Sequence, residues 1–198
     1  MARDDRAHPL TVQLVPHRTA WADEFAAAAG RLRAVLGRLA LRIDHIGSTS
    51  VPALPAKDVI DLQVVVPSLA PIPPLVDAFA RAGYELRYAG RDHVPPGWGG
   101  PDEAWEKLLF VPPEGRRVHA HVRVAGSPNE RYALLFRDYL RADDAARDRW
   151  AEVKAQVAAA TRSREEYAEA KDPLTDELMA GAEEWAAACG WTPPPVSD

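Results

Sequence analysis

The most apolar stretch of the chain covers residues 59–66, and two polar residues, Asp61 and Gln63, interrupt it. A run of this kind, stopped by Pro67, is typical of a strand that is covered on both faces, so we predict the central strand of a sheet here. Alternate residues of a strand share a face, and Asp61 and Gln63 are therefore expected to point the same way. Because a buried carboxylate normally needs a hydrogen-bond partner or a metal ion, Asp61 is the first candidate for a functional residue.

Hydrophobic periodicity predicts the elements around this strand. We expect strands near residues 11–15, 41–46, 84–87, 107–111 and 117–124, and helices over 21–35 and 75–80. Glycine and proline residues indicate a mobile loop over 89–103. The expected fold class is α/β (α+β), in one domain of residues 1–198 with a mixed sheet over 10–125 and three or four helices in a C-terminal part over 126–190.

Composition argues against several classes of protein. The 198 residues include 24 Lys and Arg against 29 Asp and Glu, a net charge of -5, which does not suit a general duplex DNA binder. With Cys189 as the single cysteine, an internal disulfide and a cysteine-based zinc site are excluded. No apolar run approaches the length of a membrane span, and no secretory signal is apparent at the start. We expect a cytoplasmic protein without a membrane or DNA partner.

A second functional signal lies in the loop before the predicted central strand. Gly47, Ser48, Thr49 and Ser50 directly follow a predicted strand. Such a glycine lets the backbone approach a phosphate group closely, while N–H groups and hydroxyls supply hydrogen-bond donors. An acidic residue on the next strand can hold a Mg²⁺ ion that bridges to the same phosphates. The alternative is a turn whose hydroxyls bond to the backbone.

Basic residues and histidines add to these candidates. Lys57 lies four residues before Asp61, from where it could neutralise a phosphate. His119 and His121 share one face of a predicted strand, and together with Asp61 they would offer two imidazoles and one carboxylate. That donor set suits Zn²⁺, Mn²⁺ or Fe²⁺ better than Mg²⁺. The alternative for the histidines is an ordinary polar strand face.

The glycine-serine turn followed by a carboxylate on the next strand resembles the nucleotidyltransferase superfamily. The signature of that superfamily has a second carboxylate two positions on, where this chain has the neutral Gln63. A closer resemblance, to the GrpB family, covers nearly the whole chain. It is carried by Leu14-Val15-Pro16 with Trp21, the segments 43–52 and 57–61, His119-Ala120-His121-Val122, the segment 136–141, and Tyr167 with Lys171.

The GrpB resemblance implies a nucleotidyltransferase-like mixed sheet with flanking helices. A related domain is fused to dephospho-coenzyme A kinases, which suggests a nucleotide-related role by association. The resemblance favours a metal-dependent nucleotidyltransferase-like protein that binds a nucleotide or another phosphorylated ligand. The expected divalent metal is Mg²⁺ or Mn²⁺, with Zn²⁺ as a further candidate. The neutral Gln63 leaves two alternatives open: a non-catalytic nucleotide or phosphate module, and a metal-dependent enzyme that uses an Asp/His site.

These expectations assign a role to each candidate residue. Asp61 and Lys57 are the catalytic candidates, and Asp61, His119 and His121 are the metal candidates. The phosphate-binding candidates are Gly47, Ser48, Thr49, Ser50, Arg137 and Lys171. Tyr167 and Lys171 lie one helical turn apart and could close a cleft. Residues 91–93 could belong to a lid, and Trp98 and Trp105 are candidates to stack on a base, although core packing is the simpler role for Trp105.

Overall fold

The computed structural model describes residues 12–196, and the strands within that range form one five-stranded sheet with the order β1-β2-β5-β4-β3. The strands are β1 (Arg42–Ile46), β2 (Ile60–Val66), β3 (Glu85–Arg91), β4 (Glu106–Val111) and β5 (Val118–Val124). β2 and β5 are parallel, and the other neighbouring pairs are antiparallel. The predicted central strand is thus the second strand of a mixed sheet.

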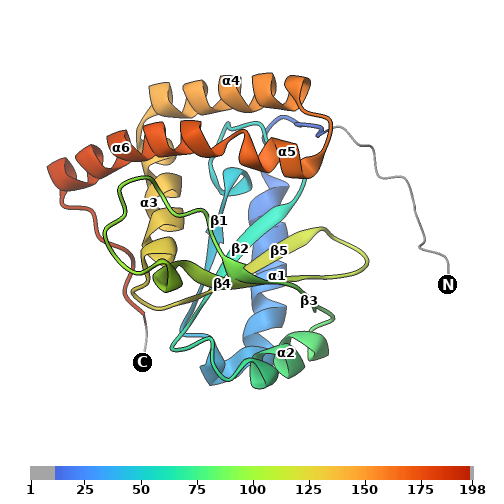
Figure 1. Ribbon diagram of the computed structural model, residues 1–198. Helices are drawn as coiled ribbons and strands as arrows, with labels where there is room; N and C mark the ends of the chain where they lie inside the picture. The colour runs from blue at the N-terminus through green and yellow to red at the C-terminus, as the bar shows by residue number, and fades with distance from the viewer. Residues whose placement is uncertain (1–11, 197–198) are drawn as a thin grey trace.

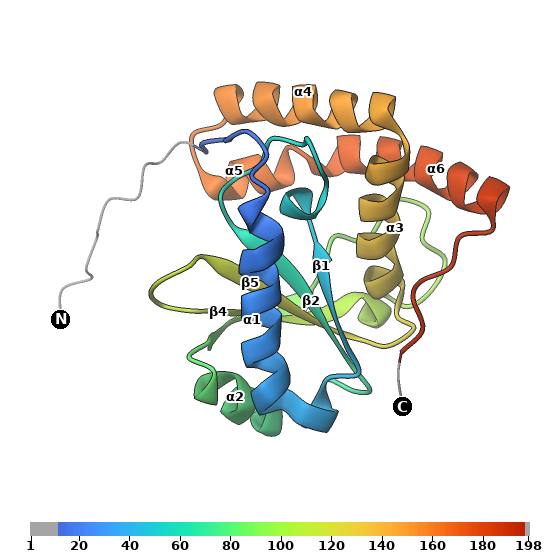
Figure 2. The same cartoon turned by 180° about the vertical axis from the view of Figure 1, so that it is seen from behind.

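One face of the sheet is apolar and carries the main core. Helices α1 (Ala20–Leu36) and α2 (Ile72–Arg81) cover this face, as Figure 2 shows. Leu62 and Val64 of β2 are fully buried against them, and Phe79 of α2 stacks on Phe110 of β4 with ring centroids 3.9 Å apart. Each large side chain buried in this way stabilises the fold by about 1.5–3 kcal/mol.

The opposite face of the sheet is polar and is covered by α3 (Pro128–Ala142). Arg42 donates to both carboxylate oxygens of Asp44 at 2.9 Å and also contacts the Glu130 carboxylate of α3. Buried polar groups need such partners, so these bonds both fix α3 on the sheet and satisfy the strand residues. The side chains in the middle of this face are therefore charged or polar rather than apolar.

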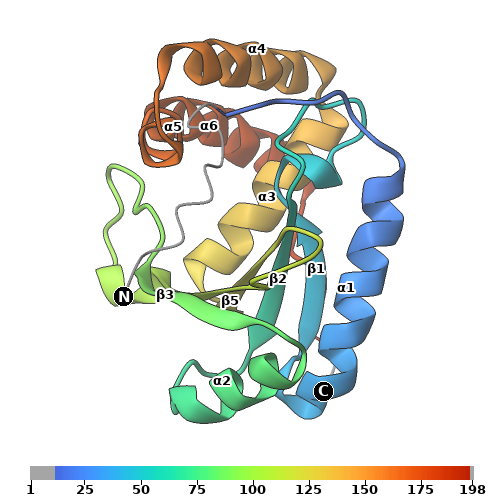
Figure 3. The same cartoon turned by 90° about the vertical axis from the view of Figure 1, so that its right-hand side faces the viewer.

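Three helices lie across one end of the sheet, as Figures 1 and 3 show. They are α4 (Asp144–Ala160), α5 (Arg164–Glu169) and α6 (Asp172–Cys189). Val51 and Leu54, from the loop that joins β1 to β2, pack into a cluster with Trp150 of α4 and Leu178 of α6. Within residues 12–196, none of the helices combines the length and apolar character that crossing a membrane requires.

The mixed α/β class is confirmed, and the C-terminal part contains four helices within the described residues. Two local predictions were wrong. Residues 12–15 form no strand, because Val15 makes an isolated bridge to Ala56, and Thr11 lies outside the described residues. β3 continues to Arg91, into the predicted loop, because Gly90 and Arg91 pair with β4. Short 3-10 helices, η1 (Gly37–Leu39), η2 (Ser48–Ser50) and η3 (Asp102–Trp105), complete the fold.

Candidate functional site

A cavity of about 350 Å³ lies between the polar sheet face and the helices at its end. Its walls come from the loop after β1, from β2, β5 and η3, and from helices α3 to α6. The residues of the predicted site that line it are Gly47, Ser48, Thr49, Lys57, Asp61, Asp92, His93, Trp105, His119, His121, Arg137, Tyr167 and Lys171. The structure therefore brings most of the predicted residues into one place.

The carboxylate of Asp61 lies between two imidazoles because β2 and β5 run parallel in register. Asp61 is paired with His119, and Gln63 with His121. His119 Nδ1 is 3.3 Å and His121 Nε2 is 3.6 Å from Asp61 Oδ1. One ligand atom from each of the three side chains lies within 4.8 Å of the others. Two imidazoles and one carboxylate at this spacing can hold a divalent transition metal.

The protonation of this cluster suits metal binding. Burial alone raises the pKa of Asp61, but the interactions with His119 and His121 outweigh it and hold that pKa well below its ordinary value. Burial lowers the pKa of His121 to about 4, against the attraction of Asp61. At neutral pH the cluster thus offers a carboxylate and a neutral imidazole, the forms that bind metals. The buried Nδ1 of His121 has no hydrogen-bond partner among the described residues.

The turn that begins at Gly47 passes directly over Asp61. Gly47 has φ +68° and ψ -176°, a conformation that is almost confined to glycine. A Cβ atom added there would lie 2.7 Å from Asp61 Oδ2. The turn is held internally, since Ser50 Oγ donates to the Gly47 carbonyl at 2.6 Å and Thr49 Oγ1 lies 3.0 Å from His45 Nε2. Ser50 does not line the cavity, whereas Gly47, Ser48 and Thr49 do.

Three lysines line the same cavity as this turn. Lys154 of α4 donates to Ser48 Oγ at 3.0 Å and also bonds to the Pro55 carbonyl. Lys57 Nζ and Lys171 Nζ lie 5.1 Å and 4.6 Å from the ring centroid of the buried Tyr167. The sequence thus predicted two of the three lysines, and the structure adds Lys154, which is 2% exposed.

The lysine charges influence one another in this enclosed space. Burial, with the charges of Lys171 and Lys57, lowers the pKa of Lys154 to about 7. Burial and Lys57 lower the pKa of Lys171 to about 8, although Asp61 opposes this shift. The hydrogen bonds of Lys154 go to uncharged oxygens, so its positive charge is costly in the protein alone. An anion in the cavity would relieve this cost.

Arg137 lines the cavity but is bound mainly to protein groups. Its guanidinium donates to Asp138 at 2.7 Å and 3.0 Å and to the His45 carbonyl at 3.0 Å. These bonds attach α3 to the end of β1. The predicted phosphate contact of Arg137 therefore competes with a structural role.

Gln63 is fully buried and lies outside the cavity lining. Its Oε1 accepts a hydrogen bond of 2.7 Å from Arg123, and Arg123 Nε donates to Asp92 Oδ2 at 2.8 Å. Burial raises the pKa of Asp92, but Arg123 and Lys107 outweigh it and hold that pKa well below its ordinary value. Gln63 stands where the superfamily signature has its second carboxylate, and the guanidinium of Arg123 therefore lies next to that position.

Of the predicted lid residues 91–93 and the two candidate tryptophans, some line the cavity and others do not. Asp92 and His93 line the cavity, and His93 Nε2 lies 3.0 Å from Asp176 Oδ2 of α6. Trp105 is 3% exposed and also lines the cavity, whereas Trp98 is exposed at the surface and meets Trp105 edge to face. The predicted loop therefore contributes one wall of the cavity and is attached to α6.

Lys154 and Tyr132 are two of the cavity residues that the sequence predictions missed. Lys154 lies one helical turn after Trp150 and next to Val153, on the buried side of α4. A lysine within an apolar helical stripe is unusual, and this was the signal available in the sequence. Tyr132 gave no such signal, because its position against Trp105 depends on the tertiary fold.

Comparison with known proteins gives one family. A family model described as GrpB protein matches residues 11–180. A dephospho-CoA kinase of Mycolicibacterium paratuberculosis is 35% identical over 92% of this chain, but the chain spans about half of that protein's length, 48%. The UPF0157 protein BH1888 of Halalkalibacterium halodurans is 34% identical over 88% of this chain and 84% of its own length.

A solved structure agrees with this result. The crystal structure of the conserved protein GrpB from Enterococcus faecalis matches with a TM-score of 0.70 and 29% sequence identity. The match covers 87% of this chain and 99% of that chain.

Proposed function

Since this chain belongs to the GrpB family, for which the sequence resemblance implies a nucleotidyltransferase-like fold, we propose that the cavity binds a nucleotide or another phosphorylated ligand. The observation that carries this proposal is the group of three lysines, Lys57, Lys154 and Lys171, around the Gly47–Ser48 turn. Positive charges in a partly enclosed site attract phosphate strongly, because screening by water is weak there. The relatives named dephospho-CoA kinase make coenzyme A precursors reasonable ligands to test.

A divalent metal ion fits beside the phosphate site. Asp61, His119 and His121 would hold it, and their donor set favours Mn²⁺ or Zn²⁺ over Mg²⁺. Such an ion supplies Lewis-acid stabilisation of charge on a phosphoryl oxygen. Arg123 binds Gln63 near the second carboxylate position, so the charges there favour one metal ion rather than two.

The reaction that fits this arrangement is nucleotidyl transfer. The oxygen of an acceptor would bond to the α-phosphorus as the bond from that phosphorus to pyrophosphate breaks, and the acceptor proton would pass to water. Lys57, Lys154 and Lys171 would hold the departing phosphates, where negative charge increases. Gly47 and Ser48 would position the phosphate chain against Asp61.

A non-catalytic binding module is the second candidate, and Gln63 is the observation that favours it. The Gln63 amide lies out of the cavity and is bound to Arg123, so it adds no charge to a metal site. A protein of this kind would keep the lysines and the glycine-serine turn but would not transfer the nucleotide.

A thermal-shift experiment tests the proposal. ATP, dephospho-coenzyme A and coenzyme A are each added with Mg²⁺, Mn²⁺ or Zn²⁺ to the wild type, to Asp61→Asn and to a control, Asp77→Asn, whose site is exposed on α2. A ligand at 100 times its Kd should stabilise the protein by about 2.7 kcal/mol, or roughly 5–10 °C in Tm. The part of the Tm shift that depends on the metal ion should disappear in Asp61→Asn and remain in the control.

The outcomes separate the candidates. Release of pyrophosphate from ATP by the protein that shows the shift would support transfer, and binding without release would support the module. A metal shift that needs no nucleotide and is lost in His121→Ala would favour a different metal-dependent enzyme at the Asp/His site. No shift with any ligand would contradict the proposal.

A further inference from the structure

The wall of the cavity formed by η3 and α3, which we call the Trp105 side, contains two buried polar atoms that make no well-formed hydrogen bond to the protein. Trp105 Nε1 has no hydrogen-bond partner among the described residues, and Tyr132 Oη, which interacts with the Asp176 side chain, makes no hydrogen bond of normal geometry, although both side chains line the cavity. Trp105 is 3% exposed, and its ring meets that of Tyr132 edge to face at 5.6 Å. A buried indole N–H or phenol hydroxyl normally bonds to something, so these atoms point to a ligand.

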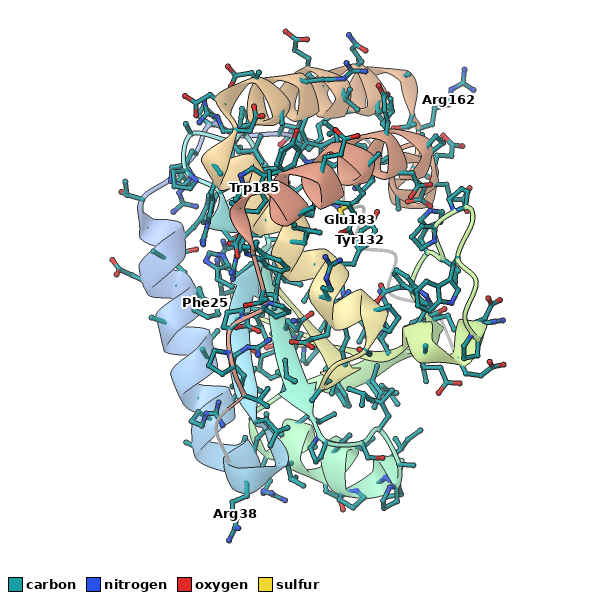
Figure 4. All side chains as sticks on the ribbon, turned by 90° about the vertical axis from the view of Figure 1, so that its left-hand side faces the viewer. Phe25, Arg38, Tyr132, Arg162, Glu183 and Trp185 are labelled. Atoms are coloured by element: carbon teal, nitrogen blue, oxygen red, sulfur yellow. The ribbon has the colours of Figure 1, made fainter. Side chains whose placement is uncertain are left out.

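The charges on the Trp105 side differ from those near the lysines. Asp172 lines the cavity, and it shares with Asp176 the imidazole of His93, at 3.7 Å and 3.0 Å. Burial, followed by the charges of Asp176 and Asp172 and by a side-chain hydrogen-bond interaction with Asp176, raises the pKa of Tyr132 above its ordinary value. Its hydroxyl therefore stays protonated and can both donate and accept. Figure 4 shows Tyr132 on α3, beside α6.

A phosphate is a poor match for this side of the cavity. The carboxylates of Asp172 and Asp176 would repel it, whereas they accept hydrogen bonds from hydroxyl or ammonium groups. Aromatic walls also suit the carbon face of a polyol or an organic cation. The Trp105 indole N–H would donate to a hydroxyl oxygen of such a molecule.

We propose that the Trp105 side is a subsite for a second ligand, a hydroxyl- or amine-bearing acceptor molecule of the sugar or polyol class. Trp105 Nε1 and Tyr132 Oη would bind its hydroxyls, and Asp172 and Asp176 would receive its hydrogen bonds. The acceptor role rests on the proposed function, since it is the acceptor hydroxyl that would attack the nucleotide. Binding of the sugar alone does not depend on it.

Saturation-transfer NMR with three matched probes tests this subsite. D-glucose carries hydroxyls, D-glucosamine replaces one hydroxyl by an amine, and D-glucuronate keeps the sugar ring and carries a carboxylate. In the presence of inorganic tripolyphosphate, we expect glucose and glucosamine to bind and glucuronate to bind at least tenfold more weakly. Tyr132→Phe and Trp105→Phe should each weaken sugar binding at least fivefold and leave the Kd of tripolyphosphate within twofold. Trp98→Phe, at the exposed neighbouring ring, is the control.

The result distinguishes this inference from the proposed function. Tripolyphosphate binding without any sugar binding would overturn the subsite alone, as would sugar binding that Tyr132→Phe and Trp105→Phe leave unchanged. Preference for glucuronate would contradict the charge argument. Sugar binding that depends on Tyr132, in a protein that fails to bind tripolyphosphate, would keep the subsite and refute the phosphate site. Tyr132→Phe removes one oxygen atom, so its fold should survive, and thermal unfolding checks this.

Discussion

At Gly47 the backbone passes close to the Asp61 carboxylate. Its φ of +68° with ψ of -176° is essentially restricted to glycine, and the space for a side chain is already taken by Asp61. The close approach would let the Gly47–Ser48 turn share the proposed ligand with the Asp61 cluster. The position thus links the two halves of the proposed site.

Gly47→Ala should cost about 1–3 kcal/mol in backbone strain alone, with a further cost because the new Cβ meets Asp61. Gly83→Ala is a matched control, since Gly83 has φ +79° but nothing within 4 Å of an added Cβ. Chemical denaturation should show a larger loss for Gly47→Ala, accompanied by loss of metal binding in calorimetry. Equal losses in stability, with metal binding intact in both variants, would contradict the close approach.

Some residues of the candidate site could be predicted from the sequence, whereas the position of Lys154 could not. Asp61, His119, His121 and the glycine-serine turn could be predicted, because strand alternation places side chains on known faces. The position of Lys154 against Ser48 could not be predicted, because α4 reaches the turn through packing between segments far apart in the chain.

At the scale of elements, the short helix α5 holds Tyr167 against Lys57 and Lys171. The Ser163 hydroxyl caps α5 by accepting a hydrogen bond of 3.0 Å from Glu166 N, and the Glu166 carboxylate accepts one of 2.8 Å from Arg162 N. These two hydrogen bonds cap the start of α5 and so fix the position of Tyr167, whose ring lies beside Lys57 and Lys171.

Ser163→Ala should therefore destabilise the protein by about 1 kcal/mol and weaken phosphate binding by a few fold, since α5 becomes less ordered. Ser163→Asp, which keeps an N-cap acceptor, should retain both properties. Thermal unfolding and titration with tripolyphosphate measure the two effects. A full effect on stability without any effect on binding would show that α5 does not organise the lysines.

The elements themselves were largely predictable from hydrophobic periodicity. The strands at 42–46, 60–66, 106–111 and 118–124 lie close to their predicted ranges, because each has one apolar face toward α1 and α2. β3 was predicted too short. Its outer residues are exposed along a sheet edge, so pairing with β4 rather than burial defines its end.

At the scale of the whole molecule, the stability should depend on pH through the buried lysine. Because the pKa of Lys154 falls from 10.5 to about 7 on folding, the unfolded chain binds more protons than the folded one between these pH values. The free energy of unfolding should therefore rise with pH above 7, by up to about 1.4 kcal/mol per unit.

Denaturant unfolding at pH 7, 8 and 9 measures this slope. In Lys154→Met the free energy of unfolding should rise less steeply than in the wild type, by about 1 kcal/mol per pH unit. Arg149 is an exposed cation on the same helix, and Arg149→Met should keep the full slope. The same slope in the wild type and in Lys154→Met would mean that Lys154 is not perturbed by folding.

The central claim, that the lysines around the Gly47–Ser48 turn bind phosphate, is tested most directly by calorimetric titration with inorganic tripolyphosphate at pH 7. This probe has no base, sugar or acceptor, so it tests phosphate binding separately from recognition of the rest of a nucleotide. The account predicts binding by the wild type, at least tenfold weaker binding by Lys154→Met, and an affinity within twofold of the wild type for Arg149→Met. No binding by the wild type, or equal affinity in Lys154→Met, would contradict it.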